Sequence, residues 1–191
     1  MTDSCAEWLC EEMAPELLPF LRERWSPRAF DPVHSLGGED VDVLLEAARW
    51  APSAGNSQPW AFHVTLRDTE AWRSLVQHLA GSSNAWASQA SALVVNLSHV
   101  HVEDTDWEYS EFSIYDLGQA VAHMTIQAHS MGLACRQFRA FDKDAVCNLL
   151  QVPLHWDVVT MTAIGRASKE ARRGPRASLR AADITWPRAA V

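Results

Sequence analysis

Residues 24–30 combine residue types that bind anions. The segment reads R-W-S-P-R-A-F, which places Arg24, Ser26 and Arg28 close together at an expected helix-to-loop junction. A guanidinium presents a planar fork of donors that matches phosphate oxygens, and a serine hydroxyl adds another donor. These residues could therefore hold a terminal phosphate. On composition alone, a solvated basic patch is the better interpretation, because two arginines and a serine occur together on many surfaces.

Residues 51–60 form a second segment with binding chemistry. The sequence A-P-S-A-G-N-S-Q-P-W contains two prolines, one glycine, two serines and two side-chain amides. An amide can pair with the mixed donor and acceptor edge of a heterocycle, and a stiff loop loses little entropy on binding. The alternative is an ordinary helix-to-strand turn with an Asn cap. The composition favours the binding loop.

Helices and strands that would position these segments follow from hydrophobic periodicity and from cap, Gly and Pro signals. One helix should begin near Gly38 and end before Pro52, between the two segments. The pattern also predicts helices over 14–24, 70–80, 113–133 and 142–150, the last begun by an Asp cap, and strands over 61–66, 91–97 and 158–164. Interleaved helices and strands indicate an α/β or α+β domain.

The clearest element is the helix expected over 113–133. Its apolar residues alternate at spacings of three and four: Ile114, Leu117, Val121, Met124, Ala128 and Met131. Small residues at 118, 120 and 122 permit close approach of another backbone. The partner could be the same helix of a second subunit, or the helix could be buried inside a monomer, and periodicity favours neither.

Composition excludes several classes of function. The chain has 191 residues and a net charge of -8, which suits one globular domain and opposes binding to a nucleic acid backbone. Residues 1–13 carry four acidic side chains and no signal-peptide pattern, and no later window is apolar enough to cross a bilayer, so we expect a cytoplasmic protein without membrane contact. The four cysteines form no C-x-x-C pair, and the eight histidines lack ligand spacing, so no metal is expected.

The two segments together resemble the FMN-dependent nitroreductase family. Its members carry R-x-S-x-R-x-F and, after the next helix, A-P-S-x-x-N-x-Q-P-W-x-F, and both patterns stand here in full. Further likeness covers N-A-W-A at 84–87, Y-D-L-G-Q-A at 115–120, G-L at 132–133, F-D at 141–142 and G-R at 165–166. The resemblance spans residues 22–186, nearly the whole chain.

The resemblance implies an α+β fold in which helices surround a central, mostly antiparallel sheet and a long central helix forms a homodimer. Residues 1–191 would be one domain, with an N-terminal helical arm over 1–21 and an extended tail over 168–191 that wraps the partner subunit. FMN would lie in each of two clefts at the subunit interface, with NAD(P)H as the electron donor and a small molecule as the substrate.

The resemblance also implies site residues. Arg24 and Ser26 would hold the FMN phosphate, with Trp25 and Arg28 beside them, and a C-terminal arginine would complete the phosphate site. Residues of the 52–56 loop would reach the isoalloxazine from the other subunit. The remaining cofactor residues implied are Pro52, Ser53, Ala54 and Asn56 in that loop, Asn84 and Gln137 elsewhere, and Arg176, or second Arg173, in the tail.

The correspondence is weakest before residues 141–142. Many relatives have glycine where Ala140 stands, at a stretch whose backbone faces the flavin N5, and Ala disfavours positive φ, so the loop could be reshaped. Arg139 and Ala140 are the candidates near N5. Arg139 could point to solvent, or it could bring a cation to the flavin cleft and select an anionic substrate. The sequence supports these two interpretations equally.

The acidic run over 103–111 precedes the long helix, where a segment often covers the flavin in this family. Trp107, Tyr109 and Phe112 are therefore candidate lid residues that contact substrate, although charge runs are mostly solvated surface.

The expected function is an oxidoreductase in which NAD(P)H reduces FMN and leaves, and a nitroaromatic, quinone or similar electron-poor acceptor then takes the electrons in a ping-pong cycle. Two alternatives stay open. The chain could be an FMN-dependent oxidase or dehydrogenase of a dedicated metabolite, or a degenerate flavin-binding protein without turnover.

Overall fold

The computed structural model describes residues 18–171 as one sheet with helices on both faces. The strands are β1 (Trp60–Leu66), β2 (Ala92–His99), β3 (Ala134–Phe138) and β4 (Trp156–Gly165), in the order β1-β2-β4-β3 with every neighbouring pair antiparallel. The helices are α1 (Pro19–Glu23), α2 (Gly38–Arg49), the short η2 (Ala54–Asn56), α3 (Glu70–Val76), α4 (Gly81–Ala87), α5 (Ser113–Ser130) and α6 (Lys143–Leu150). The α+β fold with an antiparallel sheet is thereby confirmed.

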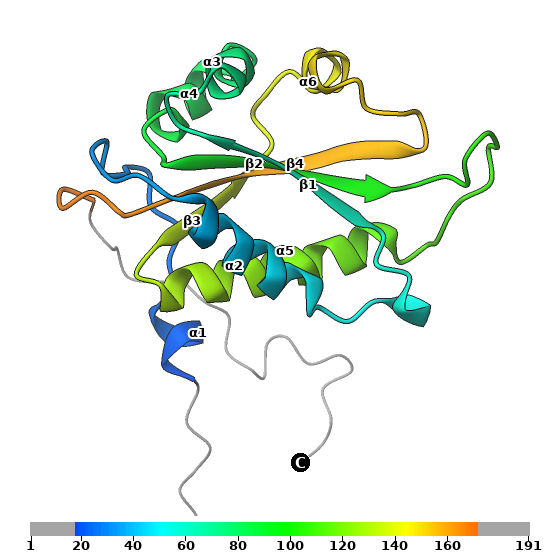
Figure 1. Ribbon diagram of the computed structural model, residues 1–191, viewed down its shortest axis with the longest axis horizontal. Helices are drawn as coiled ribbons and strands as arrows, with labels where there is room; N and C mark the ends of the chain where they lie inside the picture. The colour runs from blue at the N-terminus through cyan, green and yellow to red at the C-terminus, as the bar shows by residue number, and fades with distance from the viewer. Residues whose placement is uncertain (1–17, 172–191) are drawn as a thin grey trace, which may run out of the picture.

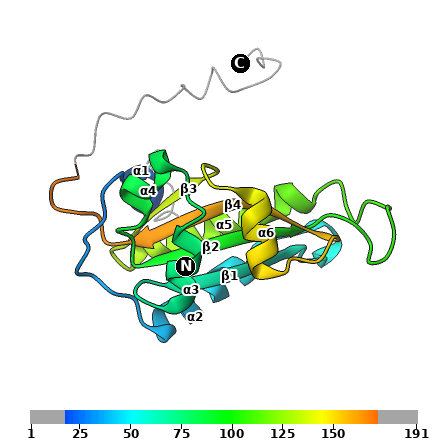
Figure 2. The ribbon, with the colours of Figure 1, turned by 90° about the horizontal axis from the view of Figure 1, so that it is seen from above.

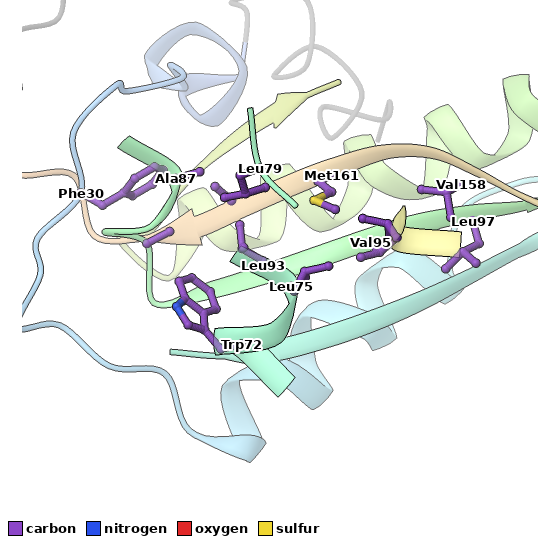
Figure 3. Close-up of a cluster of buried hydrophobic side chains, with 13 residues drawn as sticks. Phe30, Trp72, Leu75, Leu79, Ala87, Leu93, Val95, Leu97, Val158 and Met161 are labelled. Carbon is purple, nitrogen blue, oxygen red and sulfur yellow. The ribbon is translucent and has the colours of Figure 1, made fainter. Parts of the chain in front are cut away.

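Two apolar cores separate the sheet from its helices. Along β2 the side chains alternate, so that Leu93 and Val95 face α3, α4 and α6, whereas Ala92 and Val94 face α2 and α5. Figure 1 shows α2 and α5 below the sheet, and Figure 3 shows the core on the other face, where Trp72 and Leu75 of α3 meet β2. Because both faces of β2 are covered, its apolar run contains no polar alternation at 92–95.

α5 is the longest helix and ends three residues earlier than its pattern predicts. Gly132 has a φ of 75°, and the amide of Leu133 donates to the carbonyl of Ala128 at 2.9 Å, which is a glycine-based helix stop. Met131 and Leu133 still pack against the α2 side of the sheet although they lie beyond the helix. The α6 start is confirmed, since the side chain of Asp142 accepts from the amide of Ala145 at 3.1 Å.

Two elements of the sheet region were not predicted. β3 has two polar residues, Arg136 and Gln137, in succession, so its sequence lacks the alternation of apolar and polar residues that predicts a strand. α4 is a short helix whose apolar residues form no stripe along one face. The helix expected over 14–24 is described only from Pro19, and the helix expected over 70–80 ends at Val76. None of the helices within residues 18–171 has the length and apolar character needed to cross a membrane.

Candidate functional site

A cavity of about 600 Å³ lies along one face of α5. Most of its apolar wall comes from α5, and polar side chains enter from three other places: Arg24 and Ser26 from the turn after α1, Gln137 from β3 and Thr160 from β4. Its volume lies within the range of small-molecule sites, which combine an apolar lining with a few convergent polar groups.

The chain just after the Arg24 turn is fixed by its backbone beside the end of β4. The amide of Asp31 donates to the carbonyl of Arg166 at 2.9 Å, and the amide of Ser168 donates to the carbonyl of Ala29 at 3.0 Å. Within the turn, Arg24 Nη1 donates to Ser26 Oγ at 3.4 Å. Both side chains that sequence predicts at a phosphate are therefore adjacent and at the cavity.

Within the described part of the chain, the positive charge at this turn has no neutralising carboxylate. Among residues 18–171, no ion pair joins Arg24, Arg28 or Arg136 to an acidic side chain. Burial and the positive charge of Arg28 lower the pKa of the Arg136 guanidinium. In a chain with a net charge of -8, this gathering of guanidiniums is the arrangement that an anion would stabilise.

Gln137 enters the cavity from a fixed position on β3. Its Nε2 donates to Thr125 Oγ1 at 2.8 Å, and that hydroxyl donates to the carbonyl of Val121 at 2.7 Å. Cys135, two residues earlier on the same face of β3, is fully enclosed, and burial raises the pKa of its thiol to about 12. The thiol therefore stays neutral and is no nucleophile, whereas the Gln137 amide is a held polar group in the wall.

The 52–58 loop is held by α5 instead of entering this cavity. Asp116 is 2% exposed; its Oδ2 accepts from the amide of Ala54 at 2.9 Å, and its Oδ1 accepts from Gln119 Nε2 at 3.2 Å. Gly55 and Asn56 have φ values of 58° and 55°, which projects Asn56 outward as an exposed residue. The loop is thus rigid, as its composition predicts, and its binding groups face away from its own core.

The two sequence motifs lie at opposite ends of α5 within one protomer. Asp116, which holds the loop, and Thr125, which holds Gln137, are separated by roughly 13 Å of helical rise. Figures 1 and 2 show the 54–56 turn at one end of α5, with α1 and β3 at the other. The structure brings Arg24, Ser26 and Gln137 together and leaves Pro52, Ser53, Ala54 and Asn56 apart from them.

The remaining predicted cofactor residues have different positions. Asn84 is exposed on α4, across the sheet from α5. Trp25 is half-buried beside Arg24, and Arg28 is exposed two residues after Ser26. Arg173 and Arg176 lie outside the described residues.

Ala140 and Arg139 lie beyond the lining of the cavity. The carbonyl of Ala140 accepts from the amide of Ala80 at 3.0 Å and from Ser83 Oγ, and Ala140 does not belong to the described residues with positive φ. The loop therefore needs no glycine at 140. Arg139 Nη1 donates to the carbonyl of Val158 at 3.1 Å, and its guanidinium lies 5.7 Å from the ring centre of Phe141.

The candidate lid residues lie at the loop end of α5. Trp107 is 76% exposed and Phe112 is 47% exposed, whereas Tyr109 stacks on His99 at 3.9 Å. The amide of His99 donates to the carbonyl of Pro59 at 3.0 Å. The segment that carries the candidate lid residues and the 52–58 loop are therefore neighbours. Burial lowers the pKa of His99, which keeps the stacked ring neutral.

Sequence reasoning missed three residues that shape the site. Arg136 braces the Arg24 turn through Ser26, Asp116 anchors the loop, and Thr125 fixes Gln137. Only Asp116 gave a usable signal, since a carboxylate next to the apolar stripe of a helix must find a partner when buried.

Comparison with known proteins decides the family. A family model described as "Nitroreductase family" matches residues 21–102 and 75–166. The chain belongs to the nitroreductase family.

Two similar proteins cover most of the chain, and a third covers part of it. A crystal structure of an oxidoreductase containing FMN is 31% identical, with a TM-score of 0.75 and coverage of 82% of this chain and 80% of that one. Protein DrgA of Synechocystis sp. is 25% identical over 78% of this chain and 83% of its own length. An oxygen-insensitive NAD(P)H nitroreductase of Salmonella typhimurium is 31% identical over 42% of this chain and 35% of its own length.

Proposed function

We propose that this protein is an FMN-dependent oxidoreductase that takes hydride from NAD(P)H and passes electrons to nitroaromatic, quinone or similar electron-poor acceptors. The observation that carries the proposal is the pair Arg24 and Ser26, which lines a cavity of about 600 Å³ and lies beside guanidiniums that no carboxylate of residues 18–171 neutralises. The 31% identical structure that contains FMN supports the same cofactor, and the Salmonella relative supports the donor.

The residues present fit FMN. A phosphate dianion suits Arg24, Ser26 and Arg28, because charge-assisted hydrogen bonds from guanidinium forks are strong. The apolar wall of α5 suits an aromatic ring system, and the Gln137 amide offers a polar contact within the wall. Bound FMN would supply the acceptance and release of hydride, which no side chain of this site can perform.

A homodimer would complete the site. Ile114, Gly118, Ala122 and Ile126 recur every four residues on the cavity side of α5, and the first three are exposed. If two copies pack these stripes antiparallel about a twofold axis near Gly118 and Ala122, the first turn of one α5 lies beside the last turns of the other. The 52–56 loop of the partner then reaches the Gln137 and Arg24 end, which one protomer alone cannot achieve.

In this arrangement the chain's own residues have distinct tasks. Arg24 and Ser26 would bind the phosphate, Gln137 would orient the ring system, and the α5 stripe would exclude water from one side of it. The 52–56 loop, stiffened by Asp116, would hold the ring from the partner's side. One open side then remains, so that donor and acceptor occupy it in turn, which is the basis of a ping-pong cycle.

Anaerobic mixing of the purified yellow protein with NADPH or NADH tests this function. We expect loss of the flavin band at about 450 nm within seconds, and its return when a nitroaromatic or a quinone is added. Reduction by an organic substrate but by neither nicotinamide would replace the reductase with an oxidase or dehydrogenase. A purified protein without flavin, which also fails to take up added FMN, would refute the proposed function.

A further inference from the structure

Arg136 is a strand residue that does not line the proposed cofactor cavity. It lies on β3, an outer strand of the sheet, and neighbours Gln137, which points to α5 and the cavity. Because successive strand residues face opposite sides, Arg136 starts on the α4 side of the sheet. Its guanidinium carbon lies 5.1 Å from the ring centre of Trp86 on α4.

From that side, Arg136 reaches the anion-binding turn. Its Nη1 donates to the carbonyl of Ser26 at 2.9 Å, and its Nε is buried without a hydrogen-bond partner among the described residues. The Trp86 face and the Ser26 carbonyl thus hold the guanidinium between them. A planar group that stacks and donates at once is a task for arginine, because a lysine ammonium cannot do both in the same plane.

The contact fixes the residue that the phosphate site depends on. Ser26 precedes Pro27, which restricts its backbone to extended conformations, and the Arg136 bond fixes the orientation of the Ser26 carbonyl. The Ser26 hydroxyl then stays within 3.4 Å of Arg24 Nη1. Without Arg136, the turn would keep both side chains but would lose the constraint that holds them together.

Arg136 also raises the positive charge of the turn at a cost to the free protein. Partial burial disfavours the charged guanidinium, and the neighbouring positive charge of Arg28 disfavours it further, which is why the pKa of Arg136 is lowered. An anion bound at Arg24 and Ser26 would offset both penalties.

We propose that Arg136 is the positioning residue that makes this site select phosphorylated flavin over riboflavin, an inference that rests on the proposed function. Arg136 acts through Ser26, and its charge adds to the field at the phosphate. Its effect should therefore appear in binding of FMN and be nearly absent from binding of riboflavin, which has the same ring system and no phosphate.

The test is titration of the flavin-free full-length protein with FMN and with riboflavin, followed by quenching of flavin fluorescence. For Arg136→Gln we expect the Kd for FMN to rise about tenfold, the low end for loss of one hydrogen bond to a charged group. The Kd for riboflavin should change less than about twofold. Arg136→Lys keeps the charge without the stacked fork, and it should recover less than half of the lost FMN affinity on a logarithmic scale.

Arg67→Gln is the matched control. Arg67 is also a half-buried arginine that donates to main-chain carbonyls, those of Gln89 at 2.9 Å and His34 at 2.5 Å, but it is remote from the cavity lining. A general loss of packing would weaken both flavins together and would do so in both variants. We expect Arg67→Gln to leave the ratio of the two Kd values as in the wild type.

The outcomes separate the two proposals. If the wild type binds FMN and riboflavin equally, the phosphate site itself is wrong and the proposed function loses its main support. If the wild type prefers FMN and Arg136→Gln keeps that preference in full, the site stands and the role of Arg136 is refuted. Full recovery by Arg136→Lys would refute the positioning role, since charge alone would then account for the effect.

Discussion

Arg24→Ala is expected to raise the Kd for FMN by about 10- to 100-fold, because a hydrogen bond between charged groups contributes about 1.5–3 kcal/mol. The side chain lines the cavity and lies 3.4 Å from Ser26 Oγ, so its removal deletes one of the proposed phosphate donors. The protein should be purified nearly colourless at micromolar concentration. Absorbance titration with FMN measures the change.

Arg73→Ala serves as the control for Arg24→Ala. Arg73 is an exposed arginine on α3, on the other face of the sheet, and it donates to the carbonyl of Asp68 at 3.0 Å. Arg73 has the same formal charge as Arg24 but does not line the cavity. FMN affinity should stay within about twofold of the wild type for Arg73→Ala. Undiminished FMN binding by Arg24→Ala would overturn the phosphate assignment.

Ala122→Glu is expected to dissociate the proposed dimer and release flavin in the same step. Ala122 is exposed at the middle of the α5 stripe, so the substitution should not disturb the monomer core. In a twofold interface it would bury two like charges close to one another, which costs several kcal/mol and should weaken dimerisation by about 100-fold or more. Analytical ultracentrifugation and flavin absorbance, recorded on one sample, measure both effects.

Ala71→Glu places the same new charge on an exposed alanine of α3, across the sheet from α5. We expect this control to keep both the dimer and the flavin. A monomeric Ala122→Glu protein that retains stoichiometric FMN would show that the site lies within one subunit. A dimeric Ala122→Glu protein would show that α5 does not form the interface.

The sequence was informative where a local pattern decides the structure. α5 follows from its apolar repeat, α6 from its Asp142 cap, and β2 from its continuous apolar run, because each of these signals lies within a short stretch of neighbouring residues. Arg24 and Ser26 could be predicted at one site because they share a short turn before Pro27. Their common position at the cavity confirms that they are adjacent, while their role in binding phosphate stays a prediction.

Long-range contacts could not be predicted in the same way. β3 exists because it pairs with β4, and its outer edge tolerates Arg136 and Gln137 in succession. The bond from Arg136 to Ser26 joins residues 110 positions apart, and that from Ala54 to Asp116 spans 62. No sequence period encodes such pairs. Ala140 is a further case, since its φ depends on contacts with α4 that only the fold creates.

Subunit mixing tests most directly whether one FMN is held by Arg24 of one protomer and the 52–56 loop of the other. Arg24→Ala removes the phosphate donor, and Ala54→Trp fills the space in front of the loop, since Ala54 is exposed. Each homodimer should lack flavin. In the heterodimer of the two variants, purified with two different tags, one site carries both substitutions and the other carries neither. The shared site predicts about one FMN per heterodimer. A heterodimer as colourless as both parents would contradict it, because a site within one protomer leaves every site damaged.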